Sequence, residues 1–197
     1  MGGSASRSVV VVQNFDTTRY LGVWWERARL PNPFQDGKKA KAIYSKMEEG
    51  GPQVEEENSA YEFLKVENSD LQPVDKTDPA SKLHRVTLEG KARKPKDSTE
   101  GVLQVKIGNA PFWGDYQVID TDYENYALIY SRVSFLGITF KEFAWVLERA
   151  ENPTTKEKAE QRVQMLIDGV NKGGKETKVT KEDFLYTGFD GGEGSEL

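Results

Sequence analysis

The sequence predicts an all-β protein, either a sandwich or a barrel, with one helix near its C-terminus. Short segments of alternating apolar and polar residues follow one another, separated by turn residues at roughly 8–12-residue intervals. After Pro153 the period changes, and apolar residues recur at helical spacing. Neither an internal repeat nor a linker is visible, which favours a single domain.

The stretch from Asn14 to Phe34 contains the first expected strand and organises the rest of the chain. A glycine just before a large aromatic residue, here Gly22 before Trp24, suits a backbone that bends sharply while the indole turns inward. An indole buries about 150–250 Å², so other elements must converge on it. Alternation then predicts two faces, with Trp24, Ala28 and Leu30 on one and Trp25, Arg27 and Arg29 on the other.

Glu26 interrupts this alternation, because it places a carboxylate on the apolar face of the expected strand. A carboxylate that points inward must be paired or protonated, since an isolated buried charge is costly. We expect a partner such as Arg85 or Lys141.

Further strands are expected at about 39–47, 53–57, 61–66, 82–93, 101–107, 116–120, 126–133 and 140–149. Turn residues at 49–52 and 122–125 indicate hairpins. The polar, proline-containing segment 68–80 predicts a loop and an insertion. A short edge strand is expected at 184–186.

The expected helix begins with a Thr-x-x-Glu capping box, Thr154 to Glu157, and ends at Gly173-Gly174. Because its apolar residues form a single stripe, we expect the helix to pack one face on the outside of the sheet. The stripe consists of Ala159, Val163, Leu166, Ile167 and Val170.

Composition excludes several classes of function. The 197 residues carry a net charge of −5 and no basic block, which argues against nucleic-acid binding. No apolar run reaches the roughly 18–20 residues of a membrane span. The absence of cysteine excludes disulfides and thiol chemistry. We expect a flexible tail or tag remnant over residues 1–13, a domain over 14–187 and a disordered acidic tail over 188–197.

The sequence contains no recognisable pattern of catalytic or metal-binding residues, so a non-enzymatic protein is predicted. His84 is the only histidine, and it is expected on the surface. Gly169 to Lys175 begins like a phosphate-binding loop, but Glu176 replaces the Ser/Thr that would hold magnesium, and the segment follows a helix instead of preceding one. No metal ligands and no required cofactor are expected.

Three separated motifs resemble the signatures of the lipocalin family. Gly22-Val23-Trp24 is similar to the first, Thr121-Asp122-Tyr123 to the second, and the lone Arg149 at the end of the last long strand to the third. The resemblance covers about 14–186 and is strongest to the branch of apolipoprotein D, the bilin-binding proteins and the bacterial lipocalins. It implies an eight-stranded antiparallel up-and-down barrel with the helix packed outside.

Two departures from the family pattern stand out. Animal members of the branch usually tie the barrel with disulfides, and the positions that match here are Lys39 and Arg132. The segment 68–80 has no obvious counterpart, which leaves strand alignment around 53–100 open.

Read physically, the three signatures form one device that closes a barrel end. We expect the Arg149 guanidinium over the Trp24 ring, a cation–π contact of about 0.5–2 kcal/mol, with its other donors on carbonyls near 15–20. Thr121 and Asp122 should brace the adjacent turn by hydrogen bonds to backbone. The six structural residues of this device are Gly22, Trp24, Thr121, Asp122, Tyr123 and Arg149.

The other end should be open, since a barrel of eight strands is just wide enough to hold one small ligand. Residues expected on inward-facing positions of strands are Tyr44, Phe63, Val105, Ile107, Gln117, Phe143 and Trp145, with Phe34 and Trp113 at the rim. Parity alone does not distinguish the inside of a barrel from its helix-covered outside.

The resemblance implies binding and transport or storage of a small hydrophobic ligand: a lipid, fatty acid or steroid, or a non-covalently held bilin or carotenoid pigment. Two alternatives stay open: a lipocalin-type enzyme, tested through Glu26 or Asp120, and a module that contacts membranes or proteins through the open end. A monomer or weak homo-oligomer is expected, and secretion is the family's usual location.

Overall fold

The computed structural model describes residues 9–32, 35, 37–47, 60–78, 80–135, 138–172 and 177–189, and side chains within this set except for 133–140. Phe34, the turn expected at 49–52, the strand expected at 53–57 and the glycine pair after the helix lie outside the described residues.

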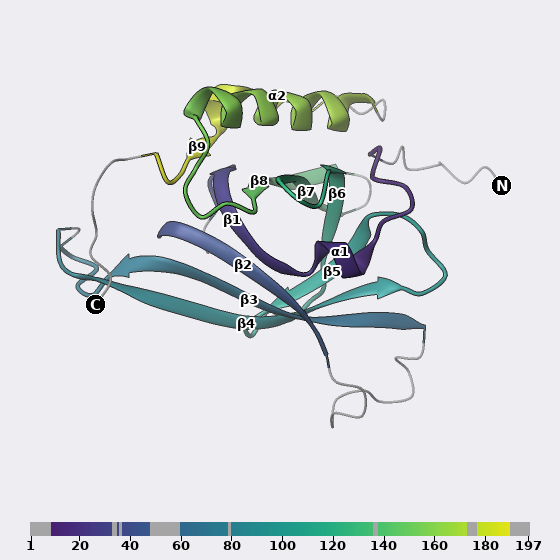
Figure 1. Ribbon diagram of the computed structural model, residues 1–197, viewed down its shortest axis with the longest axis horizontal. Helices are drawn as coiled ribbons and strands as arrows, with labels where there is room; N and C mark the ends of the chain where they lie inside the picture. Colours follow the sequence, from purple (N-terminus) through teal and green to yellow (C-terminus); the bar gives the residue numbers. More distant parts are fainter. Residues whose placement is uncertain are drawn as a thin grey trace.

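Eight antiparallel strands form a closed barrel, as predicted (Figure 1). The sheet order is β2-β3-β4-β5-β6-β7-β8-β1-β9, and β1 also pairs with β2 to close it. The strands are β1 (Gly22–Arg29), β2 (Lys38–Lys46), β3 (Tyr61–Pro73), β4 (Leu83–Pro95), β5 (Val102–Ile107), β6 (Gly114–Thr121), β7 (Tyr126–Phe135), β8 (Ile138–Glu148) and β9 (Leu185–Tyr186). The helices are α1 (Thr17–Tyr20), α2 (Lys156–Lys172) and the 3-10 helix η2 (Lys181–Asp183).

The ordered domain begins before Asn14, the boundary expected from the sequence. Val9 and Val11 are buried in the core beneath the helix. The Val12 amide donates to the Val118 carbonyl at 2.9 Å, and the Gly101 amide donates to the Val12 carbonyl at 2.8 Å. Residues 9–12 therefore pack against the barrel, and are not part of a free tail.

Strand β3 continues to Pro73, so the loop expected from residue 68 was wrong for its first part. β3 pairs without a break with β4. Two of the polar residues that suggested a loop, Ser69 and Asp70, are buried. The Gly37 amide donates to Asp70 at 3.0 Å, and the Gln72 side-chain amide donates to the same carboxylate. A strand rich in polar residues cannot be told from a loop by hydrophobicity.

A β-bulge in β1 changes which face its apolar residues use. Pairing with β8 slips by one residue between Glu26 and Ala28, which leaves Arg27 as the extra residue. Trp24 packs in the barrel interior, whereas Ala28 packs under the helix. Arg29 pairs with Glu26. The single apolar face expected for this strand was wrong, because the bulge exchanges the two faces halfway along it.

Helix α2 lies on the outside of the barrel, as predicted (Figure 1). Its five-residue apolar stripe is buried against residues of β1, β6, β7 and β8. At about 1.5–3 kcal/mol for each large aliphatic side chain, this burial holds the helix in place. No helix in the described part of the chain has the length and apolar character to cross a membrane.

The helix cap sits one residue later than expected. The Lys158 amide donates to the Thr155 hydroxyl at 3.2 Å, which makes Thr155 the N-cap residue. Thr154 instead donates its hydroxyl to Glu148 at 2.8 Å. Because Glu148 is buried and also pairs with Arg27 and Arg162, this cluster ties the start of the helix to the end of β8.

The closure device has the expected form. The Arg149 guanidinium carbon lies 3.7 Å from the centroid of the Trp24 ring, and the indole is fully buried. The guanidinium donates to the carbonyls of Arg19 at 2.7 Å, Val23 at 3.1 Å and Tyr123 at 2.9 Å. Gly22 has a φ of +100°, and a Cβ there would approach the guanidinium to 3.1 Å. Glycine is therefore required at this position, both by the positive φ and by the neighbouring Arg149 guanidinium.

The turn beside this device is braced as predicted. The Thr121 hydroxyl donates to the Tyr126 carbonyl at 2.6 Å and accepts from the Tyr123 amide at 2.9 Å. The Asp122 carboxylate accepts from the backbone amides of the next turn, at 3.1 Å, 2.7 Å and 3.0 Å. These bonds fix the Tyr123 carbonyl where Arg149 reaches it.

Replacing Arg149 tests the device. Arg149→Ala removes the ring contact and three hydrogen bonds to carbonyls, so the free energy of unfolding should fall by about 2–4 kcal/mol in urea titrations. Affinity for a cavity ligand should stay nearly unchanged, because the arginine lies outside the cavity wall. A large loss of affinity with unchanged unfolding would contradict this role.

Candidate functional site

A cavity of about 470 Å³ occupies the barrel interior above the closed end. It opens where the lining residues Phe112, Asp115 and Leu88 are exposed, beside the part of β4 that does not pair with β5. Its wall is mostly apolar. The lining residues are Glu26, Gln35, Lys41, Ala42, Tyr44, Val66, Asn68, Leu88, Val105, Ile107, Ala110, Phe112, Gly114, Asp115, Tyr116, Ser131, Phe143, Trp145 and Leu147.

The structure brings five of the residues expected from the sequence to this wall: Tyr44, Val105, Ile107, Phe143 and Trp145. The Phe143 and Trp145 rings stack, with centroids 6.0 Å apart. These five come from strands β2, β5 and β8, so the wall combines segments far apart in the chain. Ligand contact at each of them stays a prediction.

Three expected residues do not line the cavity: Phe63, Trp113 and Gln117. Phe63 lies 6.5 Å from Trp113, centroid to centroid, and the Arg93 guanidinium stands 4.3 Å from the Trp113 ring. Phe63 alternates with the interior residue Leu64, which places this cluster on the outer face of β3 and β4. Gln117 lies between Tyr116 and Val118, which face the interior, so its own side chain faces outward. For Phe63 and Gln117, parity gave two faces for the strand and the outer face was chosen. Trp113 was expected at the rim and instead packs beside Phe63.

Sequence reasoning missed several polar residues of the wall, notably Asn68, Gln35 and Tyr116. Asn68 was assigned to a loop, and only its position on the same face as Val66 in the continued strand could have identified it. Gln35 lies between strands, where periodicity carries no signal.

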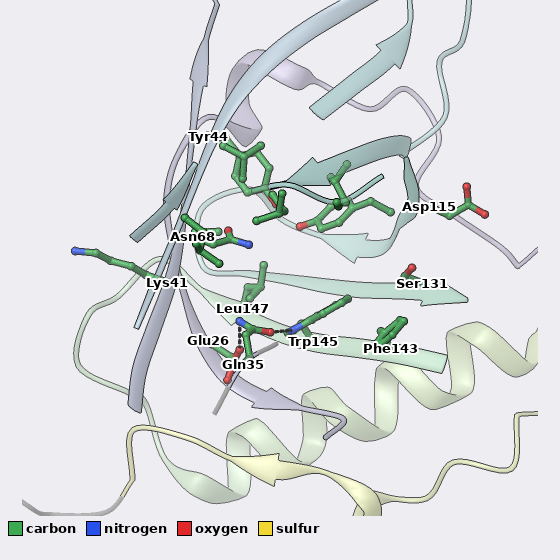
Figure 2. A pocket seen from close by; sticks show the side chains of 18 of the residues that line it. Glu26, Gln35, Lys41, Tyr44, Asn68, Asp115, Ser131, Phe143, Trp145 and Leu147 are labelled. Atoms are coloured by element: carbon green, nitrogen blue, oxygen red, sulfur yellow. Dashed lines mark hydrogen bonds between the residues drawn. The ribbon is translucent and has the colours of Figure 1, made fainter. Parts of the chain in front are cut away.

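Glu26 is paired, although not with the partners expected for it. Arg29 forms an ion pair with it, and the Gln35 side-chain amide donates to it at 3.2 Å. The Trp145 indole N–H in turn donates to the Gln35 carbonyl oxygen at 2.9 Å, as Figure 2 shows. Burial raises the pKa of Glu26, and Arg29 opposes that rise. Arg85 instead donates to Ser69.

Three tyrosines meet at the deep end of the cavity. The hydroxyls of Tyr20 and Tyr116 are 2.7 Å apart, and the Tyr44 ring lies 5.3 Å from that of Tyr20 and 6.1 Å from that of Tyr116, centroid to centroid. Burial raises the pKa of Tyr44 to about 12 and holds those of Tyr20 and Tyr116 well above the usual value. All three are therefore neutral hydrogen-bonding groups at physiological pH.

The described residues contain no cluster of three or more potential metal ligands. His84 is exposed, as expected. The arrangement can enclose and orient a small molecule by apolar contact and a few hydrogen bonds, which is the chemistry of a binding site.

A closed antiparallel barrel with one sealed end, one open end and a helix outside defines a small-molecule-binding class of fold. Residues 15–170 match the lipocalin-like domain family. The chain therefore belongs to the lipocalin family.

Curated relatives agree with this assignment. Apolipoprotein D of Rattus norvegicus is 34% identical over 143 residues, which cover 71% of this chain and 63% of that protein. The outer membrane lipoprotein Blc of Citrobacter freundii is 33% identical over 168 residues, covering 85% of this chain and 78% of the relative. The chain thus spans less than two thirds of the length of apolipoprotein D.

Solved structures share the fold at lower identity. Insecticyanin from the tobacco hornworm Manduca sexta superimposes with a TM-score of 0.62 at 21% identity, covering 93% of this chain and 86% of that one. Lobster apocrustacyanin A1 gives a TM-score of 0.61 at 18% identity, covering 87% and 78%.

The tryptophans offer a test of where a ligand lies. Of the four tryptophans, Trp145 alone lines the cavity, whereas Trp113 packs on the outer face. Titration with a non-fluorescent apolar probe should change the emission of the wild type and of Trp113→Phe, and the change should disappear in Trp145→Phe. Loss of the signal in Trp113→Phe alone would place the ligand outside the barrel.

Proposed function

We propose that this protein binds a small hydrophobic molecule non-covalently inside the barrel, and carries or stores it. The observation that supports this most strongly is the cavity itself, about 470 Å³ with a mostly apolar wall and an exposed opening. That volume lies within the roughly 300–1,000 Å³ of small-molecule sites. Burial of ligand surface at about 25 cal/mol per Å² would supply most of the binding free energy.

Two ligand types are supported: a lipid, such as a fatty acid or steroid, and a bilin or carotenoid pigment. The similarity to apolipoprotein D and to the lipoprotein Blc favours a lipid, and the stacked rings of Phe143 and Trp145 would suit a flat conjugated molecule. Any pigment would be held without a thioether bond, since the chain has no cysteine.

We also propose that the protein is not an enzyme, and we propose a location and a second candidate role for it. A carrier without catalytic activity is proposed, since Glu26, the buried carboxylate among the described lining residues, is already paired with Arg29 and Gln35. An extracellular or cell-envelope location is proposed from the relatives.

Phe112 and Val74 are 82% and 62% exposed, which favours contact of the open end with a lipid surface as a second candidate role.

The proposal is tested by releasing whatever copurifies. Native mass spectrometry should show a mass above that of the chain, and organic extraction should release a hydrophobic compound with loss of that added mass. A visible absorption band would identify a pigment, and its absence with a released lipid would identify a lipid carrier.

A cavity-filling variant supplies the matched control. Val105→Trp should abolish copurification, because Val105 lines the cavity and the new indole would occupy it. Lys106→Trp, at the next residue of β5 and outside the lining set, should retain the ligand. Equal retention by both variants would contradict binding inside the barrel.

A further inference from the structure

Three polar groups of the cavity wall already have partners within the protein. The Trp145 indole donates to Gln35, Gln35 donates to Glu26, and Glu26 pairs with Arg29. Glu26, Gln35 and the Trp145 indole N–H therefore have partners within the protein, whereas Nε of Arg29, a residue outside the cavity lining, has none among the described residues. Among the described residues that line the cavity, Asn68 on β3 has a buried side-chain oxygen without a partner.

The Tyr44 hydroxyl supplies a donor on this wall. The hydroxyls of Tyr20 and Tyr116 lie 2.7 Å apart and bond to each other. Tyr20 is fully buried outside the cavity wall, whereas Tyr44 and Tyr116 line it. The O–H of Tyr44 takes no part in the bond between the other two tyrosines, so it is available to a molecule in the cavity.

Asn68 supplies the complementary group. Its side-chain oxygen is buried and has no hydrogen-bond partner among the described residues. Tyr44 pairs with Val66, and Asn68 follows Val66 by two residues on the same strand, so both side chains face the cavity from neighbouring positions. Figure 2 shows the two on one wall. An acceptor without a partner and an available donor therefore lie at neighbouring positions of the same wall.

Unpaired positive charge is missing from this wall in the described part of the chain. The Lys41 ammonium lies 4.6 Å from the Trp25 ring and points away from the cavity (Figure 2). Arg29 is committed to Glu26. A carboxylate placed here would lose its water and face the Asn68 oxygen with no counter-charge, which is strongly unfavourable.

Building on the proposed function, we propose that the ligand carries an uncharged group that both donates and accepts a hydrogen bond, such as a hydroxyl, an amide or a lactam. This group binds at Asn68 and Tyr44, where the Asn68 oxygen accepts its proton and the Tyr44 hydroxyl donates to its oxygen. Ionised head groups are excluded from this position.

Four probes with the same alkyl chain test the inference: decane, decanol, decanamide and decanoate, each titrated calorimetrically at a pH where decanoate is ionised. Decanamide should bind at least about tenfold more tightly than decanoate, its charged analogue of similar shape.

Two variants locate the effect. Asn68→Leu and Tyr44→Phe should each weaken decanol and decanamide by roughly three- to tenfold, the range for one neutral hydrogen bond, and leave decane unchanged. Ser45→Ala is the matched control, because it removes a hydroxyl from the residue that follows Tyr44 in β2, outside the cavity lining, and should alter none of the affinities. Retained decane binding shows that each variant has kept its fold and its cavity.

Decanoate binding as tightly as decanamide, or unchanged decanol and decanamide affinity in both variants, would overturn the inference while decane binding upholds the proposed function. Failure of all four probes to bind the wild type would overturn the proposed function, and this inference with it.

Discussion

The contact between the Arg149 guanidinium and the buried Trp24 ring is the constraint on which the barrel depends. It joins the end of β8 to the start of β1, and the hydrogen bonds of the same guanidinium add the α1 segment and the turn before β7. Four parts of the chain are thereby fixed at one end without disulfides. Because closure is concentrated at this end, the interior above it can remain hollow instead of being packed to stabilise the fold.

Because of the bulge at Arg27, β1 contributes side chains to the barrel interior before the bulge and to the helix-covered outer face after it. Before it, Trp24 and Glu26 face the interior; after it, Ala28 supports the helix. A regular strand would carry Glu26 and Ala28 on the same face, and the carboxylate could not share the interior with Arg29. The bulge therefore accounts for a buried ion pair at the cavity wall beside an apolar core under α2.

Much of this could be predicted from the sequence, because the strands alternate and the closure residues are separable motifs. The apolar stripe of the helix and the structural roles of Arg149, Trp24, Thr121 and Asp122 were predicted from the sequence alone. The failures have physical reasons. Phe63 and Gln117 were placed inward because parity gives two faces without saying which encloses a cavity. Asn68 was missed because a strand rich in polar residues resembles a loop in its hydropathy. The partner of Glu26 depends on a bulge, which shifts pairing by one residue and leaves no signature in periodicity.

The central claim is that the barrel, closed at one end, encloses a space large enough for a ligand. A crystal structure with a bromine-labelled decanol, read from the anomalous scattering of bromine, tests it most directly. One strong peak is expected inside the barrel, within contact distance of Tyr44, Val105 and Trp145. A peak found only on the outer face near Phe63 and Trp113, or between α2 and the barrel, would contradict it.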